Sequence, residues 1–244
     1  MSRTIAITAA FAIAGAVAAS AEATNWTLTF TNVTPNMVVG INYNGARSFA
    51  AGPAGSYNSV YAGRMQWNGP YGKTYSTYCT QLNEYISWGQ TVTYTETEVE
   101  NVPDAPGTPG PMGSIKASIL RDLYARHYAT VMASSSSELN AAFQIAVWEI
   151  THENINAADA STALAQLNLL NGAMQINGSN ASLLAAANSL LADLGIGGFR
   201  SFDGLLGLTH ASAQDQLLVV PVPVPALLAG VGLLGVAALR RRMK

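Results

Sequence analysis

The chain has 244 residues and a formal net charge of −2, but its charges are unevenly distributed. Five of the 12 Lys and Arg residues lie in the first three and last five positions, whereas all 14 Asp and Glu residues lie between positions 22 and 239. That span therefore has a net charge near −7, which argues against nucleic acid as a partner because phosphate binding needs a basic face. Its length suits a single domain with one hydrophobic core.

The first 21 residues have the features of a secretory signal peptide. Arg3 supplies the positive start, an apolar run covers residues 5–19, and Ala19-Ser20-Ala21 is a small-residue cleavage site. This run is too short for a stable membrane-spanning helix. We therefore expect residues 1–21 to be removed and the following domain, residues 22–216, to be exported.

The first half of the exported domain is predicted to form strands. Alternating apolar and polar residues, rich in Thr and β-branched side chains, are typical of strands, and an Asn-Gly pair marks a turn. The expected strands cover residues 26–32, 37–43, 75–86 and 90–99.

A segment rich in Pro and Gly, residues 101–113, separates this half from a second half with helical periodicity. The expected helices cover residues 114–128, 137–153, 161–170 and 181–194. The sequence thus predicts an α+β fold in which a β-rich first half, either a sandwich or a barrel, packs against a helical second half.

Residues 217–244 are predicted to form a membrane-sorting tail. Residues 217–239 carry no charge, and a basic cluster follows that should stay cytoplasmic. A membrane helix needs roughly 20 apolar residues, and the stretch after Pro225 is shorter, so the Pro-rich entry is expected to lie at the membrane interface. The order Pro221, Pro223, Pro225, apolar helix, then Arg240, Arg241 and Arg242 resembles the PEP-CTERM sorting tail in its VPxPA-like variant, although the Glu of the Pro-Glu-Pro form is missing. The resemblance implies a Gram-negative host that makes exopolysaccharide, processing by an exosortase-type enzyme, and delivery to the cell surface or matrix. A plain single-pass anchor is the alternative.

Cys79 is the only cysteine of the chain. Exported proteins usually contain paired cysteines or none, because their compartment is oxidising. A single cysteine in such a protein indicates intermolecular pairing or a reactive thiol, although a buried and inert cysteine is the alternative.

Two short motifs are found together in the expected domain. Tyr78-Cys79 ends an aromatic, strand-like stretch, and Phe143-Gln144-Ile145-Ala146-Val147-Trp148 lies on an expected helix. In this order they resemble the motifs of bacterial thioester domains, which occur in surface adhesins. The resemblance covers residues 70–155 by motif, and it implies an internal thioester between the Cys79 sulfur and the Gln144 side-chain carbonyl carbon.

The residue types suit that chemistry. A thiolate attacks the carboxamide carbon and ammonia leaves, provided that the fold holds the two groups together. The product is a stored electrophile that an amine or hydroxyl of a surface or matrix target can attack once, so we expect covalent capture rather than enzymatic turnover. Tyr78, Phe143 and Trp148 flank the two partners and are expected to exclude water. No cofactor or metal is expected, because the three histidines lack metal-binding spacing.

The sequence leaves two further functions open. One is non-covalent binding of matrix polysaccharide through exposed aromatic side chains, drawn from Tyr57, Tyr61, Trp67, Tyr71, Tyr75 and Trp88. The other is glycoside hydrolysis by Glu149 and Glu153, which share a helix face. An exposed acidic face is the simpler interpretation of that pair.

Overall fold

The computed structural model describes residues 24–44, 55–104 and 110–220. The predicted signal peptide and the residues of the sorting motif, Pro221, Pro223, Pro225, Arg240, Arg241 and Arg242, lie outside the described residues. Within them, no helix has the length and apolar character that crossing a membrane requires.

Seven strands form one sheet, in the order β2-β3-β7-β6-β4-β1-β5. An additional pairing between β1 and β2 closes six of these strands into a ring, so the pairing follows the barrel alternative. The strands are β1 (Asn25–Tyr43), β2 (Asn58–Asn68), β3 (Thr74–Cys79), β4 (Thr91–Thr97), β5 (Met174–Ile176), β6 (Leu205–Thr209) and β7 (Gln216–Val219).

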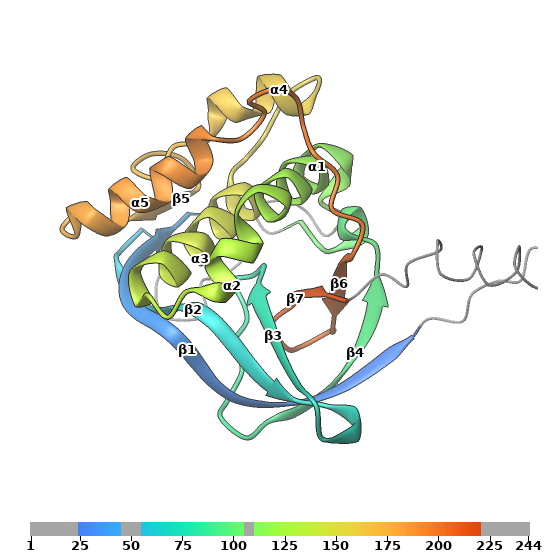
Figure 1. Ribbon diagram of the computed structural model, residues 1–244. Coiled ribbons are helices and arrows are strands. Elements are labelled where there is room, and N and C mark those ends of the chain that lie inside the picture. Colours follow the sequence, from blue (N-terminus) through green and yellow to red (C-terminus); the bar gives the residue numbers. More distant parts are fainter. Residues whose placement is uncertain (1–23, 45–54, 105–109, 221–244) are drawn as a thin grey trace, which may run out of the picture.

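The helices gather on one side of this ring (Figure 1). They are α1 (Gly113–Leu123), continued through a π-helical turn (Tyr124–Tyr128) into α2 (Ala129–Ala133), then α3 (Ser137–His152), α4 (Ala160–Ala163) and α5 (Ala181–Ala192). The α+β class and the β-rich first half agree with the sequence prediction.

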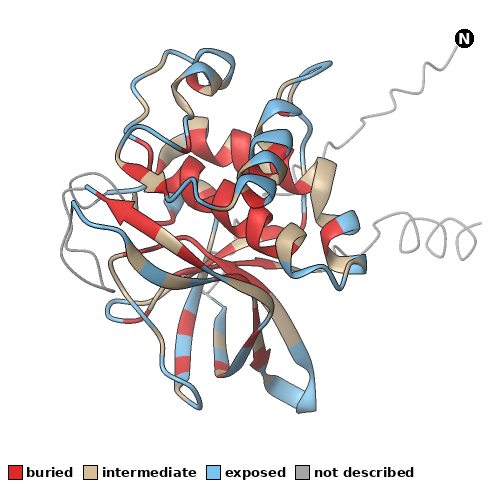
Figure 2. Ribbon diagram, turned by 90° about the vertical axis from the view of Figure 1, so that its left-hand side faces the viewer, coloured by how far each residue is buried: buried red, intermediate tan, exposed pale blue. Residues whose placement is uncertain are grey.

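Helix α3 is the centre of the core. It contacts β1, β2 and β3 on one side and α1 and α5 on the other, and Figure 2 shows its buried residues as an almost continuous band. Ser136 caps its first turn by accepting a hydrogen bond from the backbone N–H of Leu139 at 3.2 Å. A helix enclosed on all sides positions its side chains rigidly, because close-packed interiors leave them little freedom.

The bounds predicted for individual strands and helices agree less well with the structure than the predicted fold class does. The two strands expected at 26–32 and 37–43 are one long strand, β1, with two irregularities in its pairing to β2. The helix expected at 161–170 is only the four-residue α4 and a 3₁₀ turn (Leu164–Gln166). The second half, expected to be helical, also supplies β5, β6 and β7.

Strand β7 extends past the domain boundary predicted at residue 216. Residues 217–219 belong to β7, which pairs with both β3 and β6, and Leu217 and Leu218 are buried in the core. A strand covered on both faces reads as an uninterrupted apolar run, so the sequence assigned it to the tail that follows.

Candidate functional site

Cys79 and Gln144 are 65 positions apart in sequence, and the fold brings them into direct contact. Cys79 is the last residue of β3, and Gln144 lies in the middle of α3. The backbone N–H of Cys79 donates to Gln144 Oε1 at 3.0 Å, and Gln144 Nε2 donates to the backbone carbonyl of Cys79 at 2.8 Å. The oxygen and the nitrogen of the Gln144 amide are therefore both hydrogen-bonded to the backbone of Cys79, which fixes the orientation of the amide beside the thiol.

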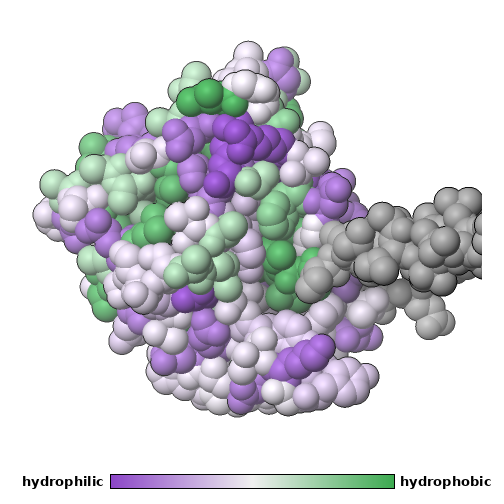
Figure 3. Space-filling view, in the orientation of Figure 1, coloured by the Kyte–Doolittle hydropathy of each residue, from purple (hydrophilic) through white to green (hydrophobic). Residues whose placement is uncertain are grey.

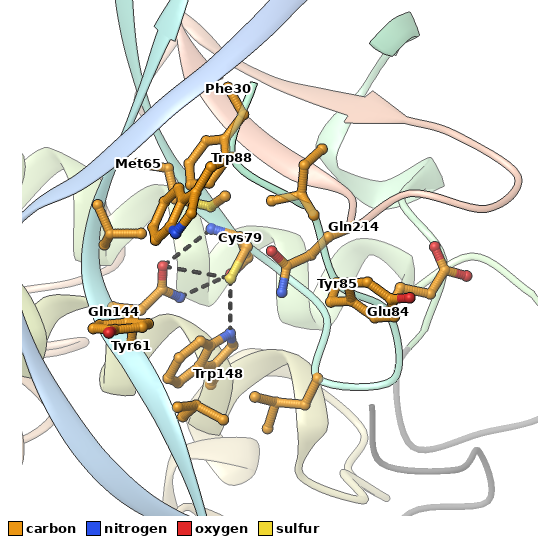
Figure 4. Close-up of a pocket in the computed structure, with 14 residues that line it drawn as sticks. Phe30, Tyr61, Met65, Cys79, Glu84, Tyr85, Trp88, Gln144, Trp148 and Gln214 are labelled. Atoms are coloured by element: carbon orange, nitrogen blue, oxygen red, sulfur yellow. Dashed lines mark hydrogen bonds between the residues drawn. The ribbon is translucent and has the colours of Figure 1, made fainter. Parts of the chain in front are cut away.

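The sulfur lies close to the carbon that it would attack. Cys79 Sγ is 3.6 Å from Gln144 Oε1 (Figure 4). Because a carbonyl bond is about 1.23 Å long, the Gln144 carbonyl carbon lies within about 4.8 Å of the sulfur.

Trp148 is the third member of the arrangement. It lies one helical turn after Gln144, so the two side chains share a face of α3. Its indole Nε1–H donates to Cys79 Sγ at 3.2 Å. The sulfur is thus flanked by the Gln144 amide and an N–H donor that can stabilise negative charge on it.

Burial controls the ionisation of Cys79. The side chain is 3% exposed, and this burial raises the pKa of the thiol to about 12, although the hydrogen bond from Trp148 opposes the shift. At pH 7 the thiolate fraction is then on the order of 10⁻⁵, which effective molarities of about 10⁵–10⁸ M can offset. Burial therefore keeps Cys79 largely in its thiol form at neutral pH.

A cavity of about 480 Å³ leads to this pair. Cys79, Gln144 and Trp148 line its inner part, and the half-exposed rings of Tyr61 and Trp88 line its outer part. Its size falls within the range of ligand sites. Access to Cys79 and Gln144 is therefore past these two aromatic side chains.

Of the three residues expected to line the site, only Trp148 does so. Tyr78 points to the other side of β3, since side chains alternate along a strand, and its hydroxyl donates to Asn140 Oδ1 at 2.9 Å. Its ring packs against Phe143 with 4.7 Å between centroids. Both residues are core rather than lining: they support the site from behind.

Glu149 and Glu153 do not form an exposed acidic face. Glu149 is fully buried, and burial raises its pKa to about 8, while Glu153 is 6% exposed. Glu149 Oε1 accepts from the backbone N–H of Asn168 at 2.5 Å, and Glu153 accepts from that of Ala173. These carboxyl groups hold the segment after α4 against α3, and neither lines the Cys79 cavity.

His152 also has a structural role. Its Nε2 accepts from the backbone N–H of Leu82 at 3.0 Å, so the proton sits on Nδ1, which is 3.0 Å from the carbonyl of Trp148. Full burial lowers its pKa to about 3. The neutral ring therefore anchors the loop that follows Cys79. Across residues 24–44, 55–104 and 110–220, no cluster of His, Cys, Asp or Glu is suited to hold a metal ion.

The aromatic residues proposed for polysaccharide binding are divided by the fold. Trp67 is completely buried and Tyr75 partly so, whereas Tyr57, Tyr61, Tyr71 and Trp88 are at least half exposed.

The sequence analysis did not predict Glu84, Tyr85 and Gln214, which also line the cavity. The first two follow Cys79 closely in sequence, a signal that could have been used, but nothing marks Gln214.

A second surface hollow, of about 560 Å³, is lined by residues that include members of β3, α2 and β7. On the face of the molecule in Figure 3, hydrophobic and hydrophilic residues are interspersed. The lining of this second hollow includes no cysteine. The Cys79 cavity is therefore the stronger candidate site.

No protein-family model, curated protein or solved structure matches this chain.

Proposed function

We propose that this chain is an exported surface or matrix protein that captures its target covalently through a thioester between Cys79 and Gln144. The observation that carries the proposal is the reciprocal hydrogen bonding of the Gln144 amide with Cys79, beside the sulfur and at the inner end of a cavity. An inert buried cysteine would need neither an oriented amide nor an entrance.

Formation of the bond uses groups that are already in place. Cys79 Sγ bonds to the Gln144 side-chain carbonyl carbon, the bond from that carbon to Nε2 breaks, and the thiol proton leaves with the nitrogen as ammonia. The Cys79 backbone N–H, which donates to Oε1, stabilises the negative charge that develops on this oxygen. The Trp148 N–H stabilises charge on the sulfur before attack.

Capture reverses the roles. An amine or hydroxyl of the target enters the cavity and bonds to the Gln144 carbon, the carbon–sulfur bond breaks, and the proton of the nucleophile passes to Cys79 Sγ. The product is an amide or ester, and the event occurs once per chain, so the protein is not an enzyme. Burial protects the thioester, because water reaches it only through the entrance.

The proposal includes the expected route to the surface. The signal peptide would export the domain from a Gram-negative cell. The tail would hold it at the membrane until an exosortase-type enzyme processes it.

The intact mass of the full chain, purified without added amines, tests the proposal. A thioester removes about 17 Da as ammonia, and methylamine then adds about 31 Da. Both changes should disappear in Cys79→Ala and in Gln144→Ala. Gln214→Ala is the matched control, because Gln214 lines the same cavity but its amide donates to the carbonyl of Gln81. A full mass with no methylamine adduct in the fresh wild-type chain would rule the thioester out.

The alternative is a non-covalent polysaccharide-binding domain. The exposed rings of Tyr61 and Trp88 at the entrance favour it as a second candidate. It predicts target binding that survives Cys79→Ala unchanged.

A further inference from the structure

Lys116 is a lysine in the interior of the protein. It lies in the first turn of α1, and its side chain is 5% exposed. Its Nζ donates to Asp104 Oδ1 at 2.6 Å and to the backbone carbonyl of Thr151, near the end of α3, at 3.1 Å. A lysine is almost never fully buried unless it is paired, because its ammonium group loses its hydration. The burial of Lys116 therefore depends on these two acceptors.

Backbone hydrogen bonds position Asp104. Its N–H donates to the carbonyl of Gly110 at 2.7 Å, and the N–H of Met112 donates to the carbonyl of Val102 at 2.8 Å. This short ladder ends where α1 begins, at Gly113. Asp104 is therefore held beside α1 by its own backbone as well as by its ion pair with Lys116.

A second buried ion pair of the protein uses arginine instead. Arg126 Nε donates to Asp122 Oδ1 at 2.8 Å, and the two side chains are 7% and 0% exposed. Asp122 also accepts from the backbone N–H groups of Gly195 and Arg200. Arginine suits buried ion pairs because its charge is spread over a planar group and cannot be lost in a protein. Lysine differs in that its amine can become neutral, and the neutral amine is a nucleophile.

The surroundings of Lys116 favour the neutral amine. Burial lowers the pKa of Lys116, although the carboxylates of Asp104 and Glu153 oppose the shift. The dipole of α1 also disfavours a positive charge in the first turn. Because a carbon–oxygen double bond is about 1.23 Å long, the Asp104 carboxyl carbon lies within about 3.8 Å of Nζ. The amine and this carbon are therefore held close together, as amide formation requires.

We propose that Lys116 and Asp104 join in an internal amide bond. Nζ bonds to the Asp104 side-chain carboxyl carbon, one carbon–oxygen bond of that carboxyl breaks, and the oxygen leaves as water with two of the protons of the ammonium group. The reaction consumes no oxidant and no other co-reactant. It replaces two buried charges with a neutral group, which removes the cost of keeping ions away from water.

The bond is a covalent brace for the fold. The sequence contains one cysteine, so a disulfide within this chain is excluded, whereas an amide forms without oxidation. It ties the Pro- and Gly-rich segment to α1, beside the end of the helix that carries Gln144. The brace does not depend on the proposed thioester.

Mass spectrometry of the full-length Cys79→Ala chain tests this bond with no thioester present. Amide formation removes one water, so we expect a mass about 18 Da below that of the sequence, unchanged by denaturation or by methylamine. Trypsin should not cut after Lys116. Tandem mass spectrometry of the peptide that contains both residues should give no fragments from the backbone between them, because the amide closes that part into a ring.

Matched variants locate the bond. Lys116→Arg and Asp104→Ala should each restore the full mass, whereas Lys73→Arg should keep the deficit, because Lys73 is an exposed lysine. A full mass in the Cys79→Ala chain, with trypsin cutting after Lys116, would overturn the amide. A deficit that survives Lys116→Arg would overturn it too, as would a deficit accompanied by backbone fragments from between the two residues. None of these outcomes bears on the thioester, because Cys79 is absent from every chain compared.

Discussion

Gln144 and Glu149 are two of the buried polar side chains of helix α3, and they differ in what surrounds them. Both atoms of the Gln144 amide pair with Cys79, beside a sulfur and a cavity. Glu149 has one oxygen on the Asn168 backbone N–H, and its Oε2 has no hydrogen-bond partner among the described residues. Burial of a polar group on this helix is therefore not sufficient for a site. A nucleophile and an entrance distinguish Gln144.

Gln144→Glu and Glu149→Gln should change the stability of the folded protein in opposite directions. Gln144→Glu should have the larger effect. It would replace the Nε2 donor with an oxygen that faces the carbonyl of Cys79, so two acceptors would meet in a buried space. We expect stability to fall by about 3 kcal/mol, because a buried group loses its partner. Denaturant unfolding in a Cys79→Ala background measures this cost with no thioester present in either chain.

The same substitution also tests the chemistry. In the Cys79 chain, Gln144→Glu has no ammonia to release, so the 17-Da loss should be absent and methylamine should add nothing. Unchanged stability would contradict the hydrogen bonds described for Gln144, whereas an ammonia loss would place the acyl group on another residue.

Trp148→Phe should sharpen the comparison with a smaller effect. It removes the N–H that donates to Cys79 Sγ but keeps an aromatic ring in the core. Because a hydrogen bond to a charged group contributes about 1.5–3 kcal/mol, thioester formation should slow by roughly 10- to 100-fold. Mass spectrometry of freshly refolded chain follows the rate of ammonia loss.

Trp67→Phe is the control for this prediction. Trp67 is also buried, and its N–H donates to Thr77 Oγ1 at 2.7 Å, away from the sulfur. Both variants should lose about 1 kcal/mol of stability, but only Trp148→Phe should react slowly. Equal rates for the two would show that the Trp148 hydrogen bond does not assist the reaction.

Sequence patterns predicted the features of this fold that depend on neighbouring residues, but not those that depend on contacts between distant residues. Local patterns identified the α+β class and the course of α3, because the 3.6-residue period of its apolar positions is a local property. The contact between Cys79 and Gln144 was expected from a resemblance of motifs, since no local pattern encodes proximity across 65 positions. Strand β7 was missed because its pairing partners, β3 and β6, are set by the tertiary fold.

The same reasoning explains the error at Glu149 and Glu153. Two acidic residues four positions apart are usually solvated, so the pattern predicted an exposed face. The backbone N–H groups of Asn168 and Ala173 replace water at these carboxyls, and both come from a segment that sequence reasoning took for helix or left unassigned. Strand alternation places Tyr78 and Cys79 on opposite faces of β3, and the sequence prediction did not use this signal.

Glu149→Gln should have the smallest effect on the free energy of unfolding. It should stabilise the protein, unlike Gln144→Glu, and the gain should depend on pH. Burial raises the folded-state pKa of Glu149 to about 8, whereas an unfolded Glu titrates near 4.3. Between these values the folded state binds the extra proton, so this group lowers stability as pH rises from about 5 to 8. Glutamine does not titrate and retains an oxygen for the Asn168 N–H. We expect little change at pH 5 and a gain of at least about 1 kcal/mol at pH 8, measured by urea unfolding at both pH values.

Glu138→Gln, on the partly exposed first turn of α3, is the control, and it should change stability by less than about 0.5 kcal/mol at either pH. If Glu149→Gln instead lost stability equally at both pH values, Glu149 would be ionised in the folded protein, and the contrast between the two positions on α3 would have to be one of charge rather than of access.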